Sequence, residues 1–137
     1  MKPKNSITDI TDKFRKNYPV DKSSEILFNL LFYSFNCDEA GSLDTIERSN
    51  RIYLYRNIDK LLKSFYLNDH ASLKYFFQDD YGSPEDIVIP MLWEMLVLAN
   101  GSDLYGESPG EERIELHRFY EELTSLLYFL YEQYKRK

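Results

Sequence analysis

Apolar residues recur along this chain at spacings of three and four, which is the period of a helix that buries one side against a core. The clearest example is residues 45–67, where the predicted core side is made of Ile46, Tyr53, Leu54, Ile58, Leu61, Leu62 and Phe65. The last part of the chain repeats the pattern with Ile114, Phe119, Leu123, Leu126, Leu127, Leu130 and Tyr134. We therefore expect two long amphipathic helices in these regions.

Residues that start or stop helices divide the rest of the chain. Pro19 ends a first short helix, and Ser23 or Ser24 is placed to cap a second, strongly apolar one. Asp69 is placed to cap a short helix that follows it. The chain up to residue 78 is thus expected to hold four helices separated by short turns.

Serine followed by proline and acidic residues is typical of a helix start, and it occurs at Ser83 and again at Ser108. Pro90 lies inside the helical pattern after Ser83. Either it kinks one helix, or a short turn ends and a second helix starts near it. No segment shows the strict alternation of a strand. We predict an all-α fold in which residues 1–137 form one domain, a bundle of five to seven helices with an acidic, glycine-rich loop before the last helix.

Acidic residues are concentrated in one part of the chain. The net charge is −6, yet residues 79–122 contain 12 acidic and two basic residues, so the remainder carries a positive excess. An acidic region disfavours nucleic acid and anionic membranes as partners and favours a basic protein, although a solvated face without a partner has the same composition. The segment GSDLYGESPGEE, residues 101–112, holds three glycines, four acids and one tyrosine.

The same segment resembles the colicin- and pyocin-type nuclease immunity proteins. That family carries G-x-D-L followed by aromatics, then an acidic turn ending in S-P before a helix; this chain has GSDLY at 101–105 and ESP at 107–109. Gly106 stands where the family has a second aromatic, and DDYGSPEDIVIPMLW at 79–93 is similar to the same acidic turn. Immunity proteins of contact-dependent growth inhibition systems are similar in size and charge. In both groups an acidic protein binds and blocks a basic toxin domain.

The resemblance implies an immunity protein that neutralises a basic toxin domain such as a nuclease. Glycines would let the segment adapt to the partner, acidic side chains would steer the partner, and the tyrosine would be the anchor. The predicted partner-binding residues are Asp103, Tyr105, Glu107, Glu111, Glu112 and Glu115.

Residues 36–47, NCDEAGSLDTIE, have the spacing of a calcium-binding loop, which gives a second hypothesis, a helical regulatory or adaptor protein. An EF-hand loop takes oxygen ligands at positions 1, 3, 5, 9 and 12 and glycine at position 6. Ala40 at position 5 supplies no side-chain oxygen, and the segment fits equally an ordinary turn in which Asp44 caps the next helix. We expect no specific calcium site; its ligands would be Asn36, Asp38, Asp44 and Glu47.

Basic residues with tyrosines between them follow one predicted helix and give a third hypothesis, a small nucleic-acid-associated protein. The residues are Arg48, Arg51, Arg56, Lys60 and Lys63, with Tyr53 and Tyr55. A solvated helix face has the same pattern, and the acidic net charge favours that interpretation.

No motif in the chain indicates catalysis. His70 and His117 are far apart in sequence, Cys37 has no second cysteine to pair with, and glycine motifs for phosphate or dinucleotide binding are absent. Glu94 lies in the most apolar helix, and is either a carboxylate with a raised pKa or a residue that faces water. We expect neither enzyme activity nor a cofactor. The N-terminus lacks a secretory pattern and residues 87–99 are too short to span a bilayer, so we expect a cytoplasmic protein.

Overall fold

The computed structural model describes residues 7–35, 44–77, 83–100 and 110–134, and these parts of the chain form α-helices and no strand. The helices are α1 (Ile7–Asn17), α2 (Val20–Phe35), α3 (Thr45–Tyr66), α4 (His70–Tyr75), α5 (Val88–Asn100) and α7 (Gly110–Tyr134). The six helices confirm the predicted all-α bundle. The predicted acidic loop falls at 101–109, outside the described residues.

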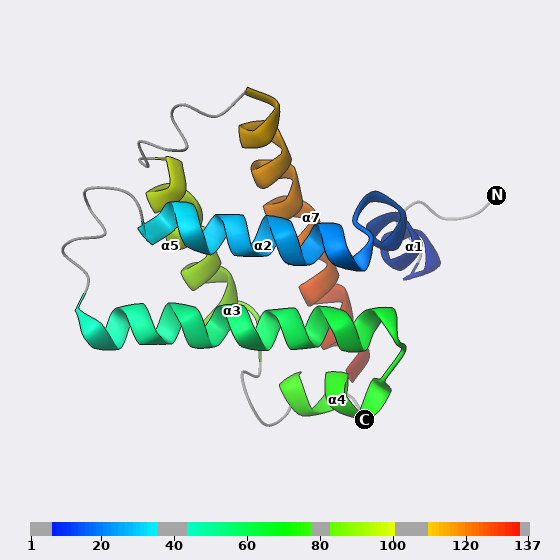
Figure 1. Ribbon diagram of the computed structural model, residues 1–137. Helices are drawn as coiled ribbons and strands as arrows, with labels where there is room; N and C mark the ends of the chain where they lie inside the picture. Colours follow the sequence, from blue (N-terminus) through cyan, green and yellow to red (C-terminus); the bar gives the residue numbers. More distant parts are fainter. Residues whose placement is uncertain (1–6, 36–43, 78–82, 101–109, 135–137) are drawn as a thin grey trace.

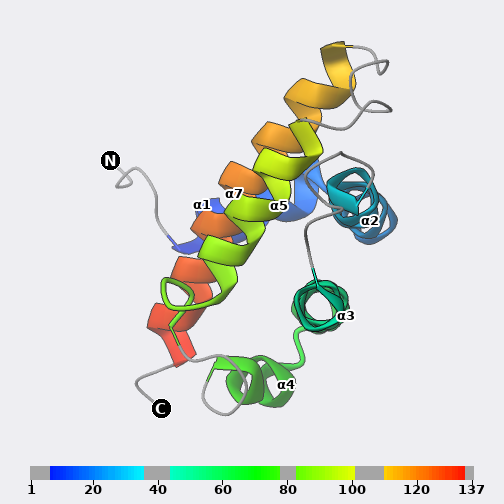
Figure 2. The same ribbon diagram turned by 90° about the vertical axis from the view of Figure 1, so that its left-hand side faces the viewer.

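The helices form two layers, with α2 and α3 in one and α5 and α7 in the other (Figures 1 and 2). α2 is central, because it packs against α5 across the layers and against α3 beside it. α1 packs on α7, and α4 lies between α3 and α7. There, Nδ1 of His70 shares a hydrogen bond with the hydroxyl of Tyr134.

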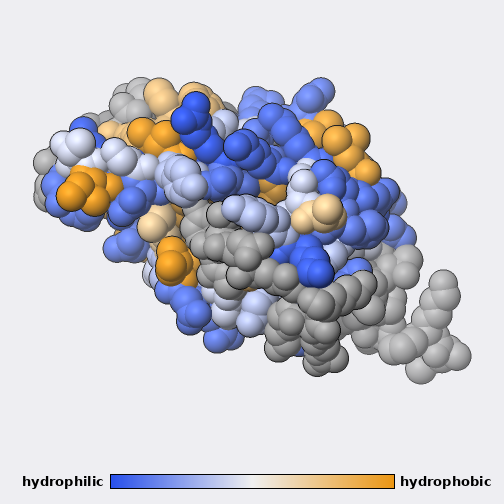
Figure 3. Space-filling model, turned by 90° about the horizontal axis from the view of Figure 1, so that it is seen from below, coloured by the Kyte–Doolittle hydropathy of each residue, from blue (hydrophilic) through white to orange (hydrophobic). Residues whose placement is uncertain are grey.

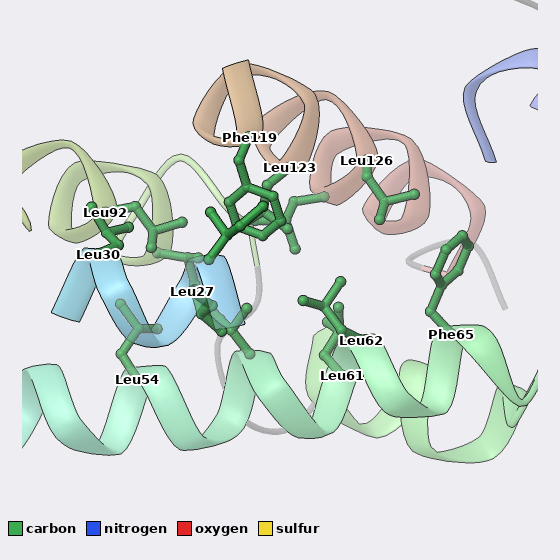
Figure 4. Close-up of a cluster of buried hydrophobic side chains, with 14 of the residues drawn as sticks. Leu27, Leu30, Leu54, Leu61, Leu62, Phe65, Leu92, Phe119, Leu123 and Leu126 are labelled. Carbon is green, nitrogen blue, oxygen red and sulfur yellow. The ribbon is translucent and has the colours of Figure 1, made fainter. Parts of the chain in front are cut away.

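Leucine and phenylalanine side chains from four helices fill the space between the layers (Figure 4). All are at most 2% exposed: Leu27, Leu30, Leu54, Leu61, Leu62, Phe65, Leu92, Phe119, Leu123 and Leu126. Burying one such side chain contributes roughly 1.5–3 kcal/mol before the loss of chain entropy is subtracted. The core therefore holds the two layers together and fixes which side of each helix faces water.

Three residues that the spacing assigns to the core are exposed instead. Ile46 is 71% exposed, Tyr53 60% and Ile114 52%, whereas the other members of both predicted sets are buried. Ile46 lies in the first turn of α3, where residues 44–50 are all exposed. Tyr53 directly precedes buried Leu54, and successive helical residues point roughly 100° apart, so the buried stripe is narrower than predicted.

The start of α2 also differs from the prediction. The helix begins at Val20, so Ser23 and Ser24 lie inside it and cap nothing. Pro19 directly precedes the helix, and its carbonyl accepts the backbone N–H of Ser23 at 2.9 Å. A proline at a helix start is favoured because its fixed φ suits the first turn and its missing N–H has no helical partner to lose.

Pro90 lies in the first turn of α5, which settles the two alternatives for this segment. A turn over residues 84–87 comes first, with the Asp86 N–H donating to the Ser83 carbonyl at 3.1 Å. The helix then begins at Val88, so Ser83 starts the turn and not the helix. Pro90 costs no helical hydrogen bond there, because amide groups of a first turn lack helical acceptors.

The surface seen in Figure 3 is mostly hydrophilic, and its hydrophobic side chains appear as separate patches. In the parts of the chain that the structure describes, every helix is too short or too polar to cross a bilayer. Patches of exposed apolar residues on a protein surface often mark contact sites for other proteins.

Candidate protein-binding face

The one tryptophan of the chain, Trp93, lies on the outer side of α5 and is 53% exposed. Its ring contacts Tyr120 of α7, with ring centroids 5.8 Å apart and ring planes tilted by 52°. Aromatic side chains bury about 150–250 Å² when they are fully covered. A half-exposed tryptophan therefore leaves a large, rigid apolar surface in water.

Apolar and aromatic side chains continue from Trp93 in both directions. In α5 and the turn before it they are three or four residues apart and so share one side. On α7 they are eight residues apart, with Thr124 between them. We call this surface the α5–α7 face; it consists of Ile87, Pro90, Trp93 and Val97 with Tyr120 and Tyr128. Only Tyr120 in this set is partly buried.

Four exposed carboxylates are close in sequence to the residues of the α5–α7 face: Glu85, Asp86, Glu94 and Glu121. Glu85 lies close to the Tyr128 hydroxyl. Partial desolvation raises the pKa of the Tyr128 phenol, and the nearby Glu85 charge raises it further. Glu85 and Tyr128 thus lie together at the edge of the face. We call the four carboxylates the acidic rim.

The acidic excess of the sequence belongs to this layer of the fold. The described residues from 83 to 134 include nine acidic and two basic residues, whereas those from 7 to 77 include eight acidic and ten basic ones. The charge is therefore separated between two layers and not only along the chain. A basic surface approaching α5 and α7 would be attracted before contact, since such fields act over about one Debye length of 8–10 Å.

The predicted partner-binding residues lie mostly where the structure gives no description. Asp103, Tyr105 and Glu107 fall outside the described residues, and Glu111 and Glu112 lie in the first turn of α7 without described side chains. Glu115 is described, and its carboxylate is 3.5 Å from Nζ of Lys22. Glu115 thus faces α2 and does not join the α5–α7 face.

Glu94 faces water, as one of the two interpretations of the sequence proposed, because its side chain is 65% exposed. Its carboxylate is 3.3 Å from Nη2 of Arg51, whose side chain is only 5% exposed. Nη1 of Arg51 donates to the Glu47 carbonyl at 3.3 Å, while Nε has no partner among the described atoms. This ion pair ties α3 to α5 beneath the acidic rim.

Burial of Arg51 corrects the basic-helix hypothesis. Arg51 precedes Leu54 by three residues and Ile58 by seven, so helical geometry puts it on the core side of α3. The exposed basic residues of that helix are Arg48, Arg56, Lys60 and Lys63. Nζ of Lys63 is held at 2.7 Å by the carboxylate of Asp59, which reduces the positive charge offered to a phosphate.

Two of the four proposed calcium ligands form a helix cap instead. Asp44 accepts the backbone N–H of Glu47 at 2.7 Å, and Glu47 accepts that of Asp44 at 3.5 Å, a capping box at the start of α3. Asn36 and Asp38 lie outside the described residues. The described part of the chain contains no group of three or more histidine, cysteine or acidic side chains arranged to hold a metal ion.

Asp44→Ala is expected to lower the free energy of unfolding by about 1 kcal/mol, because it removes the cap of α3. Millimolar calcium should leave the unfolding midpoint of both proteins unchanged. Urea titrations followed by far-UV circular dichroism, with and without calcium, measure both effects. A midpoint that calcium raises in the wild type but not in Asp44→Ala would restore the calcium-loop hypothesis.

A cleft of about 710 Å³ lies between α1 and α7, and an ion pair crosses it. Lys13 is 3.6 Å from the Glu122 carboxylate, which also accepts a hydrogen bond from Asn17 at 3.1 Å. Tyr18, 5% exposed, lines the cleft. Burial raises the pKa of the Tyr18 phenol, and its hydrogen bond to Glu122 raises it further. These contacts across the cleft hold α1 against α7.

The alkaline stability of the protein should depend on Tyr18. The fold favours the neutral phenol of Tyr18, so the phenol's contribution to the free energy of unfolding is complete below the ordinary pKa of 10.0. This contribution is lost as the pH rises above 10.0 and through the higher pKa of the folded state. Tyr18→Phe should therefore show a shallower fall of unfolding free energy above about pH 10 than the wild type. Tyr53→Phe, at a phenol already in water, is the control; an equal fall in all three proteins would refute the coupling.

The chain was compared with protein-family models, with curated proteins and with solved structures, and none of the three comparisons finds a match. What the α5–α7 face can bind therefore follows from its own residues. Exposed rings inside a rim of carboxylates are suited to an apolar patch that is edged with lysine and arginine. The sequence analysis did not single out Trp93 or Tyr120 as binding residues. The available signal was the spacing of Asp86, Pro90 and Trp93 at four and three residues, which indicates a shared outer side for the turn and the first part of α5.

Proposed function

We propose that this chain is a cytoplasmic immunity protein without catalytic activity, which binds a basic toxin domain through the α5–α7 face and blocks it. The observation that carries the proposal is Trp93, which is half exposed and contacts Tyr120 in a layer rich in carboxylates. Interface anchors are enriched in tryptophan and tyrosine, and rim charges mainly set the association rate and the choice of partner.

Charge decides which kind of partner fits. The described residues of this layer include nine acidic and two basic side chains, an excess of seven acids. The charged residues assigned to the rim are carboxylates, of which Glu94 is paired with Arg51. Nucleic acid and anionic membrane would be repelled, whereas a domain that binds nucleic acid, and is itself basic, would be attracted. A nuclease domain has that charge, which agrees with the resemblance of segment 101–109 to nuclease immunity proteins.

The two other hypotheses are less well supported by the contacts of the described residues. The adaptor hypothesis needs Asp44 and Glu47 as calcium ligands, but each already accepts a backbone hydrogen bond of the other in the cap of α3. The nucleic-acid hypothesis needs a continuous basic surface on α3, but Arg51 is buried and Lys63 is paired with Asp59.

A growth experiment tests the proposal. The test requires a basic toxin domain encoded next to this chain, which is expressed alone and together with the chain in a bacterial host. The domain alone should stop growth, and the chain should restore it. Asp86→Lys with Glu121→Lys should abolish the rescue, because both acids lie on the rim.

The matched control is Asp12→Lys with Asp21→Lys, which changes the net charge equally but on α1 and α2. This variant should still restore growth. Equal loss of rescue in both charge variants would show that net charge and not the α5–α7 face matters. Failure of the wild-type chain to protect, or absence of a gene for a basic toxin domain next to it, would contradict the immunity function itself.

A further inference from the structure

A second cleft lies between α3 and α4, where the short helix α4 runs beside the second half of α3 (Figure 1). Its volume is about 620 Å³, within the range of roughly 300–1,000 Å³ that is typical of small-molecule sites. Lys60 and Leu61 line it from α3, and Ala71 and Tyr75 line it from α4. We call it the α3–α4 cleft.

Contacts from two other helices hold the walls of the α3–α4 cleft in place. The turn that joins α3 to α4 contains Asn68, whose φ of 56° is in the left-handed region. Nη2 of Arg15 on α1 donates to the Phe65 carbonyl at 3.0 Å and to Oδ1 of Asn68 at 2.8 Å, so it fixes this turn. His70 ties the start of α4 to Tyr134 of α7. A cleft with fixed walls loses little conformational entropy when a ligand binds.

Charge distinguishes the α3–α4 cleft from the cleft between α1 and α7. Among the described residues that line it, the charged ones are two lysines, Lys60 and Lys63, whereas three acidic and three basic residues line the other cleft. Nζ of Lys63 is 2.7 Å from the carboxylate of Asp59, which offsets its charge. The exposed Lys60 therefore supplies most of the unbalanced positive charge, and an anionic group is complementary to it.

Apolar side chains in the same cleft favour an aromatic ring. Leu61 and Phe76 are 2% and 5% exposed and form apolar lining, whereas Tyr75 is 57% exposed and offers its ring. Aromatic rings attract one another when they are offset or edge-on. We propose that the α3–α4 cleft binds a small aromatic anion, a molecule with one aromatic ring and one phosphate or carboxylate group. The ring packs on Tyr75 and the anionic group binds Lys60.

An NMR titration with phenyl phosphate tests the proposal, which uses no residue of the α5–α7 face and does not rest on the proposed function. In the ¹⁵N-labelled chain, millimolar phenyl phosphate should shift the amide resonances of Ser64, Ala71 and Tyr75 until the cleft is saturated. Inorganic phosphate lacks the ring and benzyl alcohol lacks the charge. Each should bind at least about fivefold more weakly than phenyl phosphate, because each makes only one of the two contacts.

Two variants separate the charge of the cleft from its space. Lys60→Glu should raise the dissociation constant of phenyl phosphate by at least about tenfold, because repulsion replaces attraction, and should leave that of benzyl alcohol unchanged. Ala71→Trp should abolish binding of both molecules, because the larger side chain fills the cleft. Ala71 is exposed, so the far-UV circular dichroism spectrum of this variant should equal that of the wild type. Lys16→Glu makes the same charge change at an exposed position of α1 and should bind phenyl phosphate as the wild type does.

Three results would overturn the proposal. The first is the lack of a saturable shift with millimolar phenyl phosphate. The second is inorganic phosphate that binds as tightly as phenyl phosphate, which would leave the lysines as an adventitious ion site and give the ring no role. The third is an equal loss of affinity in Lys16→Glu and Lys60→Glu, which would mean that net charge and not the α3–α4 cleft attracts the anion.

Discussion

Phe119→Ala is expected to lower the free energy of unfolding by about 3–5 kcal/mol, the range typical of a phenylalanine removed from a well-packed core. The Phe119 side chain is fully buried, and its ring lies 6.0 Å from Phe14 and 5.1 Å from Tyr18. Truncation would leave a cavity between α1 and α7 and remove the aromatic contacts that join them. Urea unfolding followed by far-UV circular dichroism gives the size of the change.

Ile114→Ala is the matched control, because it removes an apolar side chain of the same helix that is 52% exposed. It should change the free energy of unfolding by no more than about 0.5 kcal/mol, as most surface substitutions do. If the two variants lost equal stability, the position of the core between α1 and α7 would be wrong.

Trp93→Ala is expected to weaken binding of the basic partner by at least about 2 kcal/mol, or roughly thirtyfold in the dissociation constant. The loss should appear as faster dissociation, because the anchor acts after contact, whereas the acidic rim acts before it. Surface-plasmon measurements with the immobilised toxin domain separate the two rates. The fold should be little affected, because half of the side chain is already in water.

Tyr53→Ala provides the comparison for Trp93, since Tyr53 is an aromatic residue of similar exposure, 60%, on α3. Its dissociation rate from the partner should equal that of the wild type. Asp86→Lys with Glu121→Lys should show the opposite kinetic signature, namely slower association and a weaker dependence on salt. Equal dissociation rates for Trp93→Ala and the wild type would remove the tryptophan from the interface.

Amphipathic spacing predicted most of the fold because each helix packs with its apolar side against the core. Leu54, Ile58 and Leu62 share one side of α3 at spacings of four, and all are buried. Capping by Asp44 and Asp69 was predictable for a local reason, since a side-chain oxygen at those positions reaches the first amides of the helix. Both features depend on residues that are close in sequence.

The errors come from contacts between distant residues. Arg51 has the same spacing as the core positions of α3, but its charge led to a prediction of exposure; it is buried with its guanidinium paired to Glu94 of α5. Trp93 lies in the most apolar helix and was not singled out, although α7 covers only part of its ring. The spacing of Asp86, Pro90 and Trp93 indicates an outer side but not which helix lies beside it. The pairings with Glu94 and Tyr120 therefore needed the tertiary structure.

The most direct test of the α5–α7 face uses its tryptophan as a probe. Because the chain has one tryptophan, labelling with 5-fluorotryptophan gives a single ¹⁹F NMR resonance, from Trp93. Adding the unlabelled basic toxin domain should shift this resonance until one equivalent is bound, since the ring passes from water into a covered interface. A resonance that stays in place while ultracentrifugation shows the complex forming would mean that the partner binds another face, and would contradict the proposed interface.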